Sequence, residues 1–65
     1  MDILIVERLY KEKYNTLYSF EYFIDLIVKG LTLIKSEALN RRANIIEQKA
    51  MRLALEYNFL ATSSI

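Results

Sequence analysis

Apolar residues recur along most of the chain with the spacing of an α-helix. In the first half the spacing alternates between four and three residues, with Lys13 as the one polar exception, in the series Val6, Tyr10, Lys13, Leu17, Phe20, Ile24, Ile27, Leu31 and Ile34. In the second half the same alternation has no exception, in the series Leu39, Ala43, Ile46, Ala50, Leu53, Tyr57 and Leu60. A heptad-like repeat of this kind places each series along one side of a helix. It predicts two helices that pack along these sides as in a coiled coil.

The two series are out of phase where they meet. The step from Ile34 to Leu39 is five residues, whereas a continuous heptad repeat would step by three or four. Gly30 is the only glycine and the chain has no proline, so Gly30 is the strongest signal for a helix end, and Thr32 or Ser36 can cap the helix that follows. Within a single domain spanning 1–65 we therefore predict a helix over about 3–30 with Asp2 as its N-cap, a turn over about 30–36, a helix over about 37–60 and a frayed tail over 61–65.

This pattern predicts an all-α fold, an antiparallel hairpin of two helices that assembles into a helical bundle. An alternative is a three-helix bundle. Asn15 and Thr16 follow the polar exception Lys13 and can mark a break in the first helix.

A two-helix hairpin leaves apolar surface uncovered. The first helix is longer than the second, and a further apolar face flanks its packing side, as Ile45 and Phe59 flank that of the second helix. A chain of 65 residues that is 54% hydrophobic has little core in which to bury this surface, and contiguous apolar patches usually mark an interface. We expect association with a second copy, with another protein, or with both, through a surface made of Ile3, Val6, Leu9, Tyr10, Tyr14, Tyr18, Phe23 and Leu26.

Four tyrosines, Tyr10, Tyr14, Tyr18 and Tyr22, follow one another at intervals of four residues. On a helix this spacing traces one inclined row of side chains. Tyrosine is enriched at interfaces because its ring is apolar and its hydroxyl tolerates water, which favours a contact surface. The other interpretation, rings that fill a core with their hydroxyls at its edge, is equally consistent with the spacing.

The composition argues against catalysis. The chain has neither cysteine nor histidine, so it lacks a thiolate nucleophile, the commonest general base and the usual zinc ligands. Its one carboxylate pair at helical spacing, Glu21 and Asp25, is most simply a solvated flank. We therefore expect no enzymatic activity, no metal or other cofactor and no small-molecule substrate. The lack of cysteine is consistent with a cytoplasmic location, and charges that interrupt the most apolar stretch, 20–34, argue against a membrane span.

A row of cations offers a competing hypothesis. Arg41, Arg42, Lys49 and Arg52 lie on or near one flank of the expected second helix, and a dimer would double the row for contact with nucleic acid phosphates. The net charge of the whole chain is only +1, which is low for a nucleic-acid-binding domain. A protein-interaction module, serving as a regulator, adaptor or small chaperone, is the favoured function, and a dimeric RNA- or DNA-binding bundle is the alternative.

Overall fold

The computed structural model describes residues 1–36 and 43–63 and places most of them in helices. A short α-helix, α1 (Ile3–Leu9), continues directly into a π-helical turn, η1 (Tyr10–Tyr14). Two longer helices follow, α2 (Phe20–Lys35) and α3 (Ile45–Ser63). The described residues contain no β-strand, and none of their helices is long and apolar enough to cross a membrane. The prediction of an all-α fold is confirmed.

The first predicted helix, 3–30, is interrupted. The helical path ends at Tyr14, whose carbonyl accepts hydrogen bonds from the backbone N–H groups of Leu17 and Tyr18 at 3.1 Å each. A new helix then begins after Ser19, whose hydroxyl oxygen accepts from the N–H of Tyr22 at 3.3 Å. The Tyr10 hydroxyl closes this break by donating to the carbonyl of Tyr18 at 2.7 Å. Asn15 and Thr16 therefore lie in a reversal of the chain, and a continuous helix over 3–30 was wrong.

The N-terminal cap was predicted correctly. Asp2 has an extended backbone, and its side chain accepts a hydrogen bond from the N–H of Leu4 at 3.0 Å. This bond satisfies one of the N–H groups that the first turn of a helix leaves without an intrahelical partner.

Gly30 does not end a helix. It is buried in the interior of α2, which continues to Lys35, so the turn predicted over about 30–36 was wrong in its placement. The residue faces α3, because a Cβ atom built on it would overlap the carbonyl oxygen of Ala50 and lie 2.8 Å from the Cβ of Ala54. Gly30 is thus required for close approach of two helices rather than for a turn.

The second long helix begins later than predicted. Asn44 and Glu47 form a reciprocal cap, in which the N–H of Glu47 donates to the Asn44 side chain at 2.7 Å and the N–H of Asn44 donates to the Glu47 carboxylate at 3.0 Å. This capping box accounts for a start at Ile45. The predicted start near residue 37 and the position Leu39 of the second apolar series lie outside the described residues, as do 64 and 65 of the predicted tail. Residues 61–63, predicted to fray, belong to α3.

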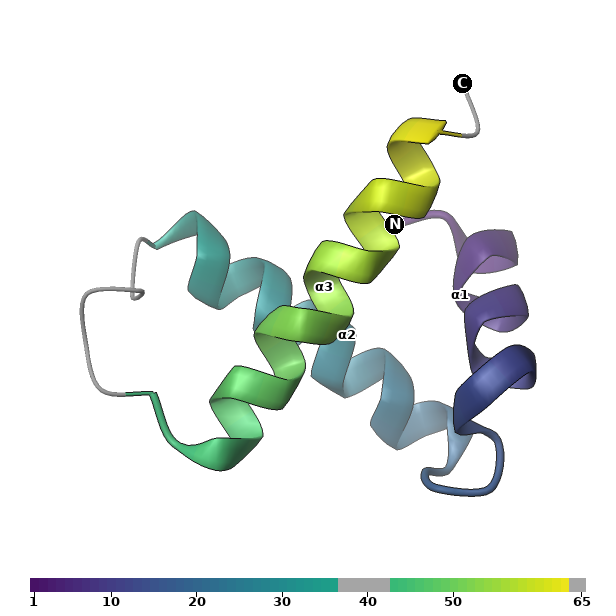
Figure 1. Cartoon of the computed structure of the whole chain (residues 1–65), viewed down its shortest axis with the longest axis horizontal. Helices are drawn as coiled ribbons and strands as arrows, with labels where there is room; N and C mark the ends of the chain where they lie inside the picture. Colours follow the sequence, from purple (N-terminus) through teal and green to yellow (C-terminus); the bar gives the residue numbers. More distant parts are fainter. Residues whose placement is uncertain (37–42, 64–65) are drawn as a thin grey trace.

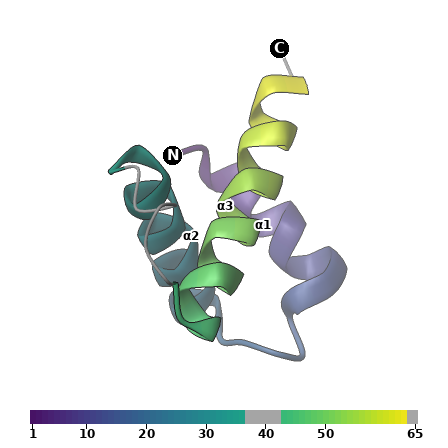
Figure 2. The ribbon, with the colours of Figure 1, turned by 60° about the vertical axis from the view of Figure 1, so that its left-hand side comes forward.

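The three helices share one core. α2 and α3 cross at Gly30, and α1 lies along one side of the crossing (Figure 1). Seen after a turn of 60°, α2 and α1 lie on either side of α3 (Figure 2). The buried side chains come from all three helices: Val6, Leu9, Phe23, Leu26, Ile27, Ala50, Leu53 and Tyr57. The backbone N–H of Asp2 also donates to the hydroxyl of Tyr57, which fixes the start of α1 to α3.

Candidate protein interface

The surface predicted from the sequence as a contact face is largely interior. Val6 and Phe23 are fully buried, Leu9 is 1% exposed and Leu26 is 3% exposed. Only Ile3 of the predicted set is exposed to any large extent, at 47%. The longer first helix was expected to leave apolar surface uncovered at its N-terminal end, and this was wrong, because the break after Tyr14 folds α1 back onto α3 and the shared core.

The tyrosine row divides between core and surface. Tyr10, Tyr14 and Tyr18 are half-buried and pack against the core, whereas Tyr22 is 44% exposed. The rings of Tyr10 and Tyr14 both contact that of Phe23, at centroid distances of 5.3 and 5.1 Å. Their hydroxyls donate at the edge of the core, that of Tyr10 to a backbone carbonyl and that of Tyr14 to a carboxylate oxygen of Glu56 at 3.2 Å. For these two tyrosines the structure favours the packing interpretation.

Glu56 of α3 links this helix to Lys13 and Tyr14 of η1. In addition to the Tyr14 hydroxyl, its carboxylate contacts the ammonium group of Lys13 at 3.2 Å. Burial raises the pKa of Tyr14 above its ordinary value of 10.0, and the neighbouring Glu56 carboxylate raises this pKa further. Lys13, the polar exception in the first apolar series, is therefore an exposed residue that pairs across the molecule.

The predicted basic row is only partly described. Arg41 and Arg42 lie outside the described residues. Lys49 and Arg52 are exposed on α3, and the ammonium group of Lys49 lies 5.7 Å from the centre of the Tyr18 ring, a cation–π distance. One of the two described cations is thus already engaged within the chain.

An exposed stripe with three large apolar side chains runs along the outside of α3. It consists of the following residues at alternating spacings of three and four: Ile45, Gln48, Arg52, Leu55, Phe59 and Thr62. All are exposed, and the three apolar members are among the most exposed large side chains: Ile45 at 79%, Leu55 at 58% and Phe59 at 71%. Because this spacing keeps side chains on one side of a helix, the residues form a continuous surface, here called the α3 outer face.

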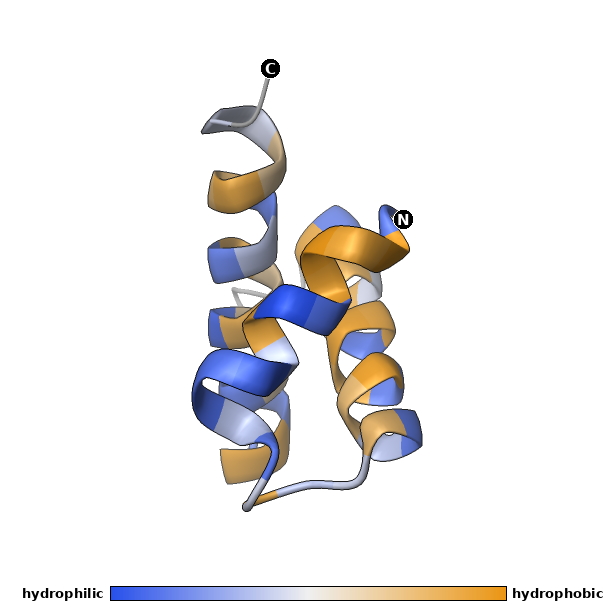
Figure 3. Ribbon diagram, turned by 90° about the vertical axis from the view of Figure 1, so that its right-hand side faces the viewer, coloured by the Kyte–Doolittle hydropathy of each residue, from blue (hydrophilic) through white to orange (hydrophobic). Residues whose placement is uncertain are grey.

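The inward face of α3 carries small residues where the helix crosses α2. Ala50 and Ala54 occupy the positions opposite Gly30, where the two helix backbones meet closely. Small residues are required at this crossing, whereas the larger buried side chains of α3, Met51, Leu53 and Tyr57, lie beside it. The hydropathy-coloured view shows apolar bands on the C-terminal turns of α3, and these turns project beyond the rest of the molecule (Figure 3).

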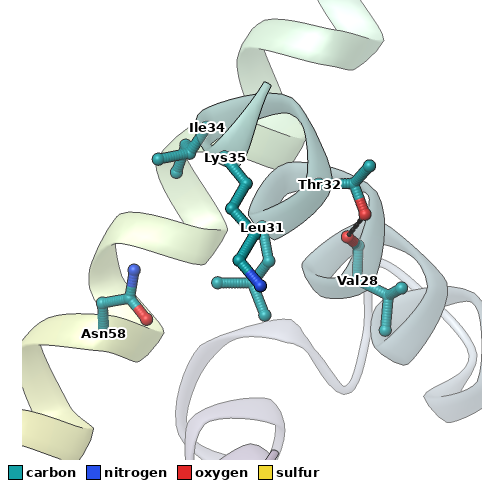
Figure 4. A pocket seen from close by; sticks show the side chains of 6 residues that line it. All are labelled: Val28, Leu31, Thr32, Ile34, Lys35 and Asn58. Atoms are coloured by element: carbon teal, nitrogen blue, oxygen red, sulfur yellow. Dashed lines mark hydrogen bonds between the residues drawn. The ribbon is translucent and has the colours of Figure 1, made fainter. Parts of the chain in front are cut away.

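A groove lies beside the outer face. It is formed by Val28, Leu31, Thr32, Ile34 and Lys35 of α2 and Asn58 of α3, where the last turns of the two helices separate (Figure 4). The Thr32 hydroxyl at its rim donates a hydrogen bond to the carbonyl of Val28 at 2.9 Å, so this hydroxyl is bonded to the backbone of its own helix. Lys35 contributes the only charged group of the lining. The groove therefore adds mainly apolar surface to that of α3.

The sequence pattern placed Ile45 and Phe59 on a flank of their helix but did not reveal Leu55 or the stripe that joins the three. A signal was present, because Ile45 and Phe59 lie two heptads apart and Leu55 lies one helical turn before Phe59. The regular series through Ala43, Ala50 and Tyr57 concealed it by accounting for α3 as a conventional packing helix. Comparison of the chain with protein-family models, with curated proteins and with solved structures found no match.

Proposed function

We propose that this chain is a small, non-catalytic protein-interaction module, a regulator, adaptor or small chaperone that masks or bridges a partner protein through the α3 outer face. One observation carries the proposal: α3 exposes the large apolar side chains of Ile45, Leu55 and Phe59 to solvent on the side that faces away from its buried residues. Burial of a side chain such as leucine or phenylalanine is worth about 1.5 to 3 kcal/mol. A partner that covers Leu55 and Phe59 therefore gains binding energy that folding of the single chain leaves unused.

The arrangement of the apolar residues also supports an interface. Single exposed apolar side chains are ordinary on protein surfaces, whereas contiguous ones mark contact sites. Leu55 and Phe59 are neighbours on adjacent helical turns, and Arg52, a residue type enriched at interfaces, precedes them on the same stripe. The projecting end of α3 leaves this part of the stripe accessible from several directions (Figures 1 and 3).

The experiment compares two charge-matched double variants. Leu55→Glu with Phe59→Glu places two carboxylates on the α3 outer face. The control, Leu4→Glu with Leu17→Glu, makes the same charge change at exposed apolar sites on α1 and on the interhelical break, which are 72% and 67% exposed. Circular dichroism verifies that both variants keep the helix content of the unchanged chain.

Association is then measured by light scattering of the purified chains and by co-purification of tagged chains from the cells that produce them. We expect the α3 variant to lose association and the control to retain it. The loss should be the same at low and high salt and with or without nuclease, because apolar contacts depend little on ionic strength. An α3 variant that associates like the unchanged chain would refute the proposed surface, and binding that disappears with salt or nuclease would support the nucleic acid hypothesis instead.

A further inference from the structure

We infer that the occupant of the α3 outer face is a second copy of this chain, whose own α3 lies against it in antiparallel orientation. This inference rests on the proposed function and adds the partner and the geometry of the contact. It is carried by the charge distribution along α3 together with the apolar stripe.

The C-terminal end of α3 lacks a cation. The last turns of the other helical segments contain basic residues, Arg8 in α1, Lys13 in η1 and Lys35 in α2, whereas the last turn of α3 has none. The free carbonyl groups at a helix C-terminus carry partial negative charge and are stabilised by a nearby cation. Within the part of the chain that the structure describes, no residue of the last turn of α3 itself supplies such a charge.

A cation without a partner lies on the same stripe. Among the described residues, the guanidinium group of Arg52 makes neither an ion pair nor a hydrogen bond, and the side chain is exposed. It is too far from the C-terminal end of its own helix to stabilise it, because ten residues separate Arg52 from Thr62, a distance of about 15 Å along a helix. A second helix in antiparallel orientation brings these two features together.

One alignment satisfies the apolar and the charged groups at once. Arg52 precedes Leu55 by three residues, and Thr62 follows Phe59 by three residues. When Leu55 of one copy lies against Phe59 of the other, Arg52 of the first copy therefore lies beside Thr62 of the second. Two-fold symmetry repeats each contact, so the dimer has two leucine–phenylalanine layers flanked by two arginine contacts to helix ends.

The shape of the molecule permits this pairing. The end of α3 projects past α1 and α2 (Figures 1 and 3), so a second copy can overlap the segment from Arg52 to Thr62 on its outer side. The overlap covers only about 15 Å of helix. Because stable interfaces usually bury more surface than so short an overlap provides, we expect a reversible dimer whose population depends on concentration.

Sedimentation equilibrium of the purified full chain, from micromolar to about millimolar concentration, tests the inference. We expect a monomer–dimer equilibrium whose dissociation constant rises about 100-fold or more in Leu55→Glu with Phe59→Glu, because two central apolar layers are lost. Arg52→Glu should raise the constant about tenfold, since it replaces attraction to two helix ends by repulsion. Lys29→Glu is the control, an equal change of charge at an exposed position on α2, and should leave the constant unchanged.

A charge swap tests the alignment. Adding Thr62→Lys to the Arg52→Glu chain should restore the dimer, because each new carboxylate then faces a lysine of the other copy. As the chain has no cysteine, disulfide trapping adds a test of orientation. A mixture of Arg52→Cys and Thr62→Cys chains, one of them isotope-labelled, should give mainly the mixed disulfide.

Each contrary outcome overturns a defined part of the inference. A chain that stays monomeric at millimolar concentration refutes self-pairing, and co-purification of another protein that is lost in the α3 variant would then leave the proposed function standing with a different partner. Predominant disulfides between two Arg52→Cys chains refute the antiparallel alignment. Self-association and co-purification that are both unaffected in the α3 variant refute the proposed function itself.

Discussion

Single tyrosine hydroxyls hold together parts of the chain that are far apart in sequence. The hydroxyl of Tyr10 closes the break between η1 and α2, that of Tyr14 reaches Glu56 on α3, and that of Tyr57 accepts from the N-terminal backbone at Asp2. A buried ring with its hydroxyl bonded at the edge of the core combines apolar burial with a satisfied polar group. In a chain with no disulfide, these contacts help to fix the path of the N-terminal segment.

The Tyr14–Glu56 contact predicts a specific pH dependence. Burial and the Glu56 carboxylate raise the pKa of Tyr14 in the folded state above 10.0, so the folded chain holds this proton more tightly than the unfolded chain does. The stabilisation is fully present below about pH 10 and is lost as the pH rises through the folded pKa. Tyr14→Phe lacks this contribution at every pH.

We therefore expect the stability difference between the unchanged chain and Tyr14→Phe to be constant up to about pH 9 and to shrink above pH 10. Urea unfolding of both proteins from pH 7 to pH 11 measures this difference. The two proteins differ only at position 14, so the effects of all other groups largely cancel. A difference that stays constant through pH 11 would show that Tyr14 ionises as freely in the folded state as in the unfolded one.

At the scale of the helices, the crossing of α2 and α3 determines the rest of the arrangement. Gly30, Ala50 and Ala54 allow the two backbones to meet, and side chains on either side of this point are then directed into the core or away from it. A glycine inside a helix normally weakens it by about 0.5 to 1 kcal/mol relative to alanine. Here that cost is offset by the close packing that the absence of a side chain permits.

Gly30→Ala should consequently destabilise the protein, although the same change stabilises an ordinary helix. The added methyl group would overlap the backbone carbonyl of Ala50, which cannot turn away as a flexible side chain does. We expect a loss of about 1 to 3 kcal/mol, as for overpacked cores, measured by urea unfolding. Thr32→Ala, an exposed change on the same helix, is the control and should be close to neutral.

Relieving the side-chain contact should not rescue this variant. In Gly30→Ala with Ala54→Gly the Cβ of Ala54 is removed, but the carbonyl of Ala50 remains in the way. We expect the double variant to be no more stable than Gly30→Ala. A Gly30→Ala chain that is more stable than the unchanged protein would show that α2 and α3 do not meet at this residue.

The helices were only partly predictable from the sequence for a physical reason. Heptad spacing reports which side of a helix is apolar, and it correctly indicated that most of the described residues are helical. It does not report where the chain reverses, so the series continued through Leu17, an exposed residue of the break between η1 and α2. Gly30 was misassigned because glycine serves both helix ends and close helix contacts. Only the position of α3 distinguishes these two roles.

For the whole molecule, the folding back of α1 changes which apolar residues are available to a partner. The sequence correctly indicated more apolar surface than two helices can bury. It could not show that α1 covers part of this surface itself and leaves the outer side of α3 exposed. That outcome depends on the reversal at residues 15–19 and on the alanines of α3, two features whose combined effect appears only when all three helices are placed together.

The variant Val6→Asp with Leu9→Asp distinguishes an α1 that is an uncovered interface from an α1 that is part of the core. If α1 were an uncovered interface, this variant would keep its fold and lose association. In the structure, Val6 and Leu9 are 0% and 1% exposed, so both carboxylates would be buried without partners, at a cost of about 3 to 5 kcal/mol or more. A domain of this length has a total stability of about 3 to 10 kcal/mol, and we therefore expect the variant to be largely unfolded.

The matched control places the same charges at exposed positions of the same helix. Ile3 and Leu4 are 47% and 72% exposed, and acidic residues in the first turn interact favourably with the helix N-terminus. Ile3→Asp with Leu4→Asp should therefore retain helix content and cooperative unfolding, both measured by circular dichroism during heating. The two variants have equal net charge and differ in their interaction with the helix ends by only about 0.3 to 1 kcal/mol per charge, so a difference of several kcal/mol between them reports burial. A Val6→Asp with Leu9→Asp chain as helical and stable as the control would mean that α1 is not part of the core, and that the exposed surface of the protein must be assigned anew.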